Sequence, residues 1–556
     1  MEKSTRNSVD RIGNHVTSKS IVVLSRLLLL CLTLPTCRAF LVSRTCPVGK
    51  IPTKQSDLRL LDTIQNPSSS SSSFSLSSSI LDEALSARYV AVDAMIDRKG
   101  SFALDKLEST LAQSRLSTRD RSFARLLVTE SMRRLGQIDH VLEMCQTKKS
   151  TPSDNNNNNN NNRQKGKRVN AVDRFIQAVL RIGAVQLLFL GTPSHAAVKE
   201  TVDLLRMPKN LHIPEAKIKY VNAVLRRMGR DGDALLARTD VTENAAPWLV
   251  HELTRAWGED ATRRIIESAM TESPRCLTVK QGPDGEANND LLQQTADLFP
   301  NSTLLSQGSL LILNPPPGKI SDWPRYEEGE WWLQDVSATL PAIILRNGLQ
   351  QNGQIGHKHV VDLCAAPGGK TAQLCSFGFG TVTAVEMSSR RSKRLHENMQ
   401  RLHLKNDCQI VIADGTEWLA DTKVDGVLID APCTATGTGS KRPDVLRKDT
   451  NYQELLDTQY KLLCHVADNI LAPGGVLVYA TCSLLPHESE DQIRKFLSRD
   501  PPATRQYTTI PIQPVEIPGF TECIDRDGWL RIIPGTKPSG LDHVDGFFVA
   551  RLQRTK

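Results

Sequence analysis

Short apolar runs alternate with longer amphipathic segments along the carboxy-terminal third of the chain. The runs predict strands at residues 359–363, 381–385, 409–413, 426–430 and 475–481. The amphipathic segments predict helices that begin at residue 371 or span residues 389–402, 452–470 and 487–497. This alternation is typical of an α/β doubly wound (Rossmann-like) domain with a parallel sheet, in which ligands bind beyond the carboxyl ends of the strands.

The region from residue 81 to about residue 230 predicts an all-α bundle. Its apolar residues recur at helical spacing in three groups: Tyr89, Val92, Met95 and Ile96; Phe123, Leu126, Leu127 and Val128; and Phe175, Ile176, Val179, Leu180, Ile182, Val185 and Leu188. Between the last two groups, Asp154 is followed by eight asparagines and a basic segment that ends at Arg168. Because this composition cannot bury apolar surface, we expect residues 150–168 to form a disordered loop.

Residues 241–352 predict a small α+β connector. Expected helices at residues 248–257 and 261–270 are followed by short strands at residues 277–279 and 310–313 and by proline-rich turns. Trp331 and Trp332 form either a surface on which RNA bases stack or part of the core. Aromatic pairs at a domain junction belong more often to the core, so we favour the core.

The amino terminus has the pattern of a targeting sequence. Residues 1–39 predict a signal peptide, because basic residues precede an apolar run at residues 27–34 that is too short to span a bilayer. Residues 40–80 are rich in serine and more basic than acidic, which fits a transit peptide. This order resembles the bipartite leaders of algae with secondary plastids. We therefore expect a plastid protein. The alternatives are another organelle or the secretory route, in which case the serine-rich stretch is simply disordered.

Composition narrows the possible partners. The 556 residues carry a net charge of +8 and a pI near 8.8, which suits a polyanionic partner, although charge runs are more often solvated faces. The twelve cysteines contain no Cys-x-x-Cys pair, so neither a zinc site nor a disulfide framework is indicated, and we expect no metal. We expect a monomer without stable membrane association.

Two cysteines suggest a specific chemistry. Cys433 and Cys482 each follow a predicted strand, downstream of the loop at residues 362–371. Carbon 5 of cytosine is a poor nucleophile, so its methylation needs a thiolate that adds to carbon 6 and a base that removes the carbon 5 proton. Each cysteine alone is readily explained as a small buried hydrophobe. The loop is not a triphosphate-binding loop, because Cys364 occupies the position of its first glycine.

The motifs together resemble the RNA cytosine-5 methyltransferase family. They are Asp-Leu-Cys-Ala-Ala-Pro-Gly-Gly-Lys-Thr (362–371), Glu-Met-Ser (386–388), Asp-Ala-Pro-Cys-Thr-Ala-Thr-Gly (430–437), Tyr-Ala-Thr-Cys-Ser (479–483) and Asp-Gly-Phe-Phe-Val-Ala-Arg (545–551). Residues 181–227 resemble the NusB-like RNA-binding domain, in which we expect His195 to be a packed or capping residue. From about residue 85 to residue 556, the chain resembles the bacterial Sun/RsmB-type enzymes that act on small-subunit rRNA.

This resemblance implies three domains and a set of roles. The domains are a NusB-like domain at residues 81–240, the connector at residues 241–352 and a catalytic domain at residues 353–556. Cys482 is implied as the nucleophile and Cys433 as the residue that aids product release. Asp430, in its protonated form, is expected to bond the N3/N4 edge of cytosine, and Lys370 to orient the site. The residues implied to bind S-adenosylmethionine are Cys364, Ala365, Ala366, Pro367, Gly368, Gly369, Lys370, Glu386 (ribose), Asp414 (adenine) and Asp430.

Three other functions stay open from the residues. A tRNA cytosine-5 methyltransferase would use the same catalytic residues. A DNA cytosine-5 methyltransferase would use the cysteine of the Pro-Cys segment, Cys433, as its nucleophile and leave Cys482 idle. A non-catalytic RNA-binding factor for ribosome assembly would tolerate the loss of both thiols.

Overall fold

The computed structural model describes residues 86–96, 103–146, 170–207, 211–281, 288–350, 354–448, 451–499 and 506–555. All of them belong to one compact unit. The expected signal peptide, transit peptide and asparagine-rich loop lie outside the described residues.

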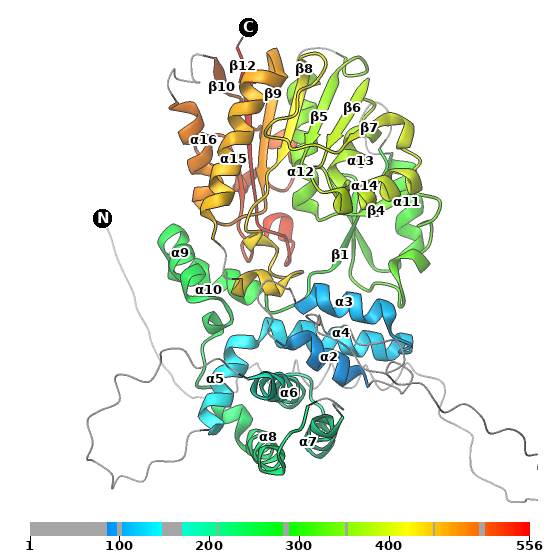
Figure 1. Ribbon diagram of the computed structural model, residues 1–556. Helices are drawn as coiled ribbons and strands as arrows, with labels where there is room; N and C mark the ends of the chain where they lie inside the picture. The colour runs from blue at the N-terminus through cyan, green and yellow to red at the C-terminus, as the bar shows by residue number, and fades with distance from the viewer. Residues whose placement is uncertain are drawn as a thin grey trace, which may run out of the picture. The chain divides into compact units, whose positions relative to one another are not determined.

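The first described residues fold as helices around one apolar core (Figure 1). These helices are α2 (Ala87–Met95), α3 (Ala103–Gln113), α4 (Thr118–Arg133), α5 (Leu135–Gln146), α6 (Ala171–Leu188), α7 (Ser194–Asp203) and α8 (Glu215–Leu236). Phe175 and Val179 are buried, whereas Leu126 lies in the predicted helix but is 44% exposed. The Asn170 side chain accepts the Asp173 backbone N–H and caps α6.

The connector joins two helices to a small antiparallel sheet. Its elements are α9 (Pro247–Trp257), α10 (Glu259–Ser268), β1 (Arg275–Val279), α11 (Asn289–Leu298), β2 (Ser302–Leu305), β3 (Ser309–Ile312) and β4 (Trp331–Leu333). The sheet order is β2-β3-β1-β4. Trp331 is fully buried and Trp332 is 5% exposed, which confirms the preference for a core position.

The carboxy-terminal part is built on a large sheet with the order β10-β12-β9-β8-β5-β6-β7, and β11 pairs with β12. Its strands are β5 (His359–Leu363), β6 (Thr381–Val385), β7 (Cys408–Val411), β8 (Val424–Asp430), β9 (Leu471–Thr481), β10 (Tyr507–Thr509), β11 (Leu530–Ile532) and β12 (Phe547–Arg554). From β7 to β9 the strands are parallel, as predicted. The expectation of an entirely parallel sheet was wrong, because β12 returns antiparallel to β9 and pairs with β10 and β11.

Helices cover both faces of this sheet (Figure 1). They are α12 (Val336–Gln350), α13 (Gly369–Ser376), α14 (Ser389–Arg401), α15 (Gln453–His465) and α16 (Glu490–Leu497). Helices α12, α13 and α14 pack on one face and α15 and α16 on the other, because neighbouring strand residues such as Val360 and Val361 point into opposite cores. The predicted Rossmann-like fold class is confirmed.

The strand order reverses direction at β5, which makes this strand the topological switch point of the sheet. The strands β6 and β7 extend the sheet on one side of β5, while β8 and β9 extend it on the other. In such sheets the loops at the carboxyl ends diverge at this point and leave a crevice for ligands. The predicted site residues therefore gather along one edge.

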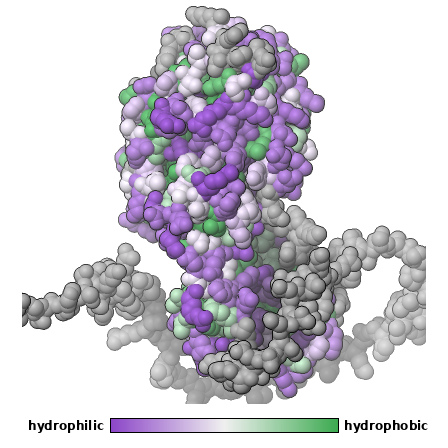
Figure 2. Space-filling model, turned by 90° about the vertical axis from the view of Figure 1, so that its left-hand side faces the viewer, coloured by the Kyte–Doolittle hydropathy of each residue, from purple (hydrophilic) through white to green (hydrophobic). Residues whose placement is uncertain are grey.

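On the face shown in Figure 2, hydrophilic side chains predominate and hydrophobic ones lie between them. Among the described residues, the model contains no helix that is both long enough and apolar enough to span a membrane.

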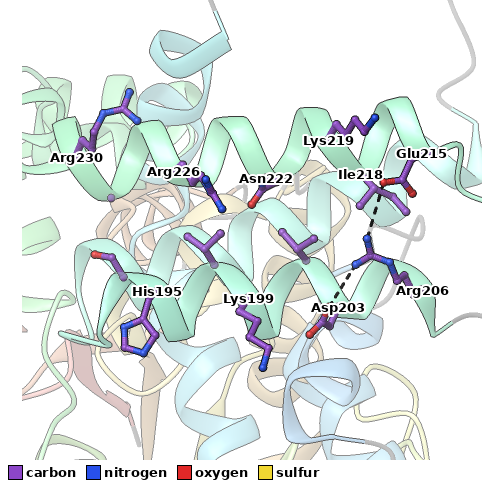
Figure 3. A pocket seen from close by; sticks show the side chains of 14 residues that line it. His195, Lys199, Asp203, Arg206, Glu215, Ile218, Lys219, Asn222, Arg226 and Arg230 are labelled. Carbon is purple, nitrogen blue, oxygen red and sulfur yellow. Dashed lines mark hydrogen bonds and ion pairs between the residues drawn. The ribbon is translucent and has the colours of Figure 1, made fainter.

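A groove of about 500 Å³ runs between α7 and α8 (Figure 3). Its floor is apolar, since Val198, Val202 and Ile218 line it and are at most 8% exposed. His195 also lines this groove. The expectation of a packed or capping His195 was wrong: His195 is exposed, and α7 has no side-chain cap.

Candidate active site

The two predicted thiols lie side by side. They follow β8 and β9, which are parallel neighbours with Asp430 opposite Ala480. The distance between Cys433 Sγ and Cys482 Sγ is 3.5 Å. The pairing of these two strands thus brings together two cysteines that are 49 residues apart in the sequence.

Backbone contacts hold the two loops together. The Gly437 N–H donates to the Cys482 carbonyl at 2.9 Å, and the Gly546 N–H donates to the Gly437 carbonyl at 2.8 Å. A Cβ at position 437 would lie 2.4 Å from the Gly546 carbonyl oxygen, so only glycine fits there. This close approach ties the loop of Cys433 to the backbone of Cys482.

The two thiols have unequal environments. The hydrogen bond with Cys482, together with burial, raises the pKa of the Cys433 thiol well above its ordinary value. The raised pKa favours the thiol form of Cys433, and either sulfur can act as the donor in the contact between them. This thiol form is consistent with Cys433 as a proton-bearing neighbour of Cys482.

A buried carboxylate, Glu488, links the loops that carry the thiols. It is fully buried, and its Oε1 accepts the Thr434 backbone N–H at 2.9 Å and Gln459 Nε2 at 3.1 Å. Its Oε2 accepts the hydroxyl of Thr434 at 2.5 Å and the hydroxyl of Ser483. Thr434 and Ser483 directly follow the two cysteines, so one anion positions both loops.

Lys370 and Asp430 form an ion pair beside the thiols. Lys370 Nζ lies 2.8 Å from Asp430 Oδ2 and 5.4 Å from the centre of the Phe547 ring. Burial favours neutral Lys370, but its hydrogen-bonded pairing with Asp430 dominates and raises the Lys370 pKa. Asp430 Oδ2 accepts a hydrogen bond from Lys370 Nζ, so the structure uses this oxygen as an acceptor. The expected contact of Asp430 with the N3/N4 edge of cytosine stays a prediction.

The loop of residues 364–370 connects β5 to α13. Side chains of α14 hold it, since Arg391 Nη2 donates to the Ala366 carbonyl at 2.6 Å and Asn398 Nδ2 donates to the Pro367 carbonyl at 2.8 Å. Gly368 has a φ of 105°, which explains a glycine there. Ala365 and Ala366 are buried, and burial raises the pKa of Cys364 to about 12, so this thiol is unreactive.

Two further acids lie at the ends of the next strands. Glu386 follows β6, is 2% exposed and accepts the N–H groups of Ala366 at 3.3 Å and Ser388 at 2.9 Å. Asp414 follows β7, is exposed and accepts the N–H and the hydroxyl of Thr416, each at 2.8 Å. The structure thus brings Glu386 against the loop, while Asp414 lies at the solvent-facing end of the same edge.

Asp362 has an unused acceptor beneath the loop. It is fully buried in β5, and its Oδ2 accepts the Thr371 hydroxyl at 2.6 Å, but its Oδ1 has no hydrogen-bond partner among the described residues. Burial raises the pKa of Asp362 to about 7, more than the Thr371 bond lowers it. A buried acceptor without a partner is costly, so a ligand that donates a hydrogen bond there would fit.

A cleft of about 590 Å³ opens beside the ion pair. Its lining includes Gly369 and Lys370 at the start of α13, Asp430 at the end of β8, and connector residues such as Arg275 and Trp332. The connector therefore supplies one wall of the cleft.

Buried charges tie the two walls together. Lys441 of the catalytic part forms ion pairs with Asp335, beside the connector strand β4, and with Asp545 at 2.9 Å. Burial disfavours the charge of Lys441, but the two carboxylates outweigh this effect and raise its pKa. Removing one member of this partly buried cluster leaves an uncompensated charge, so the cluster stabilises the contact between the two walls.

Sequence reasoning missed three parts of this site. Asp362 was recognised only as the first residue of the loop motif, although an acid inside an apolar run was a usable signal for a role of its own. Glu488 gave no such signal in the sequence, because a carboxylate at the start of a helix is common. The Lys441 cluster joins residues far apart in sequence. Among the described residues, no group of His, Cys, Asp and Glu side chains could hold a metal ion.

The fold and the site define a Rossmann-like methyltransferase domain. A family model for the 16S rRNA methyltransferase RsmB/F matches residues 351–553, and a NusB family model matches residues 160–230. Ribosomal RNA small subunit methyltransferase B of Cronobacter sakazakii is 30% identical over 430 residues, which cover 74% of this chain and 90% of the relative. The Enterobacter sp. protein of the same name is 33% identical over 388 residues, covering 68% and 82%.

The solved structures agree on the fold. The crystal structure of PH0851 superposes with a TM-score of 0.59 at 20% identity, covering 87% of this chain and 100% of that chain. From the family models and the relatives, the chain belongs to the RsmB/F family of rRNA methyltransferases and carries a NusB domain.

Replacing Glu488 is expected to separate the thiols. The variant Glu488→Gln turns one buried acceptor into a donor that faces other donors, at a cost of about 1–3 kcal/mol in the free energy of unfolding. We expect a lower yield of a Cys433–Cys482 disulfide under mild oxidant, measured by peptide mass spectrometry. Glu516→Gln is the matched control, because Glu516 is a buried carboxylate that pairs with Arg551 away from the thiols. An unchanged disulfide yield in the Glu488 variant would contradict the positioning role.

Proposed function

We propose that this protein methylates carbon 5 of cytosine in RNA, with S-adenosylmethionine as the methyl donor and small-subunit rRNA as the substrate. The observation that carries the proposal is the 3.5 Å approach of the Cys433 and Cys482 sulfurs beside the Lys370–Asp430 pair. The names of the relatives support rRNA as the substrate class.

The residues of the site suggest the order of steps. The Cys482 thiolate forms a bond to carbon 6 of cytosine, and the electron pair of the carbon 5–carbon 6 double bond moves to carbon 5. Carbon 5 then takes the methyl group, a base removes its proton, the double bond reforms and Cys482 leaves. Cys433 is suited to the release step because its thiol contacts the departing sulfur. Asp430 faces the cleft, where it can accept a hydrogen bond from the amino group of the base.

The cofactor pocket is proposed on the other side of the switch point. S-adenosylmethionine, when bound, supplies an electrophilic methyl group on a sulfonium centre. The loop of residues 364–370 would enclose its methionine part, with the free Oδ1 of Asp362 accepting from the ammonium group. Glu386, at the end of β6, is placed to accept the ribose hydroxyls, and Asp414 to contact the adenine.

The two cysteines are expected to differ on substitution. Cys482→Ala should abolish both methyl transfer and any covalent adduct with RNA, because no thiolate can add to carbon 6. Cys433→Ala should still add and methylate but should release the product slowly, so a protein–RNA adduct should accumulate. Each variant is incubated with substrate RNA and S-adenosylmethionine and examined on a denaturing gel.

The buried Cys145 offers a matched control, since Cys145→Ala removes a thiol of α5, in the helical part of the chain. This variant should behave like the native protein. An adduct that persists without Cys482 and is absent without Cys433 would reverse the two roles and favour chemistry of the DNA-methyltransferase type.

Cofactor binding is expected to weaken below neutral pH. Asp362 has a pKa of about 7, so the free protein carries a protonated Asp362 in mild acid. An ammonium group favours the carboxylate, and binding must then release that proton, which lowers the affinity by up to about tenfold for each pH unit. Calorimetric titration with S-adenosylmethionine from pH 8 to pH 5 measures this slope.

Asp362→Asn is the control for that titration. It retains Asp430, Lys370 and Glu386, whose charges also surround the pocket, but removes the titrating group. We expect weaker binding at pH 8 and a flatter pH dependence. Equal slopes for the native and the variant protein would refute the role of Asp362.

We also propose that the protein acts in a plastid. The proposal rests on the pattern of residues 1–80 alone, which lie outside the described residues. Residues 1–80 fused to a fluorescent protein should deliver it to the plastid of a secondary-plastid alga. A fusion lacking residues 40–80 should stop in the secretory route. Export of the complete fusion into the medium would overturn the proposal.

A further inference from the structure

The two thiols of the candidate active site have the geometry of an oxidisable pair. The sulfurs of Cys433 and Cys482 are 3.5 Å apart, whereas a disulfide bond needs about 2.05 Å, so they have to approach by about 1.5 Å. The strands before them are already paired, with Asp430 opposite Ala480. The remaining movement is small compared with the length of a side chain, so it does not require the strands to separate.

A small oxidant can reach this pair. Cys433 and Cys482 are each only partly buried, in contrast to the fully buried thiols of Cys145, Cys276, Cys375 and Cys523. A cation also lies beside Cys482: burial disfavours the charge of Lys370, but Asp430 and, to a smaller extent, Cys482 outweigh this effect and raise the Lys370 pKa. The Lys370 ammonium group is thus within electrostatic reach of the Cys482 sulfur.

We propose that Cys433 and Cys482 form a reversible oxidation site, in which a peroxide converts the two thiols to a disulfide that switches methyl transfer off. The inference rests on the proposed function in that Cys482 must be a free thiolate to add to cytosine. The disulfide occupies both the attacking sulfur and the sulfur suited to product release. An oxidised site can therefore neither begin nor complete a turnover.

The oxidation proceeds in two steps. The Cys482 thiolate attacks one oxygen of hydrogen peroxide, the O–O bond breaks, and the departing hydroxide takes up a proton to form water, which leaves a sulfenic acid on Cys482. The sulfur of Cys433 then attacks the sulfenic sulfur. An S–S bond forms, the S–O bond breaks, and the leaving hydroxide takes the Cys433 proton and departs as water. The two thiols thus lose two electrons and two protons to one peroxide, and a dithiol reductant reverses the change by thiol–disulfide exchange.

Cys433 acts as the resolving thiol in this sequence. The contact with Cys482, together with burial, raises the pKa of Cys433 and favours its thiol form, and a thiol is a weaker nucleophile than a thiolate. The first attack on peroxide is therefore assigned to Cys482. A sulfenic acid without a neighbouring thiol is open to further oxidation to sulfinic and sulfonic acids, which a dithiol does not restore. Cys433 thus makes the oxidation of Cys482 reversible.

The test follows the full-length protein through oxidation and recovery. After treatment with hydrogen peroxide, the native protein should contain a disulfide that peptide mass spectrometry assigns to Cys433 and Cys482. The loss of methyl transfer to substrate RNA should follow the fraction of disulfide, and dithiothreitol should restore both the thiols and the activity. Cys464→Ala is the control, because it removes another partly buried thiol, in α15, and should lose and regain activity like the native protein.

The variant Cys433→Ala tests the resolving role. Peroxide should carry its Cys482 to the sulfinic or sulfonic acid, and dithiothreitol should not restore the covalent adduct with RNA. If this variant unfolds early in a thermal scan, Cys433→Ser replaces it. Full recovery of adduct formation in the folded variant would overturn the proposal.

Three results for the native protein would also overturn it. They are a Cys482 that becomes sulfinic acid without forming a disulfide, a Cys433–Cys482 disulfide that leaves methyl transfer unchanged, and a loss of activity that follows a disulfide between Cys375 and Cys408, which contact each other elsewhere. Methylation by the reduced protein is measured first. If it is absent, the proposed function fails, and the assigned disulfide with its reversal by dithiothreitol still decides whether the oxidation site exists. If it is present and peroxide does not change it, the oxidation switch fails while the proposed function stands.

Discussion

The parallel pairing of β8 with β9 is the constraint on which the site depends. With Asp430 opposite Ala480, the loops that leave these strands emerge at the same edge, and the sulfurs of Cys433 and Cys482 lie 3.5 Å apart. A shift of the register by one residue would turn each side chain to the other face of the sheet. Strand β5 pairs with β8, so the loop of residues 364–370 that follows β5 emerges at the same edge as the loops that carry the thiols.

Hydrogen bonds then fix the positions of the loops that leave the paired strands. The buried Glu488 accepts from both loops that carry the cysteines, and such charge-assisted bonds are stronger than neutral ones. The raised pKa of Cys433 follows from its contact with Cys482 and from burial. Burial and the contact with Cys482 thus favour the protonated form of Cys433, although the two cysteines lie at nearly equivalent positions at the ends of neighbouring strands.

Much of this structure was predictable because continuous apolar runs identify buried strands. Residues 359–363 and 381–385 coincide with β5 and β6, and the order of strand and helix predicted the edge at which the chemistry lies. β10 and β11 span three residues each, too few for a recognisable period, and the antiparallel return of β12 depends on long loops. The roles of Glu488 and of the Lys441 cluster could not be predicted, because each depends on residues that only tertiary packing brings together.

The ion cluster of Asp335, Lys441 and Asp545 has a mechanical consequence. Because charges from both walls meet in this cluster, separating the walls would break the ion pair of Lys441 with Asp335 and leave both groups without their partner. The connector and the sheet, which belong to one compact unit, are therefore expected to move together. A molecule that enters the cleft then has to adapt its shape to the walls more than the walls adapt to it.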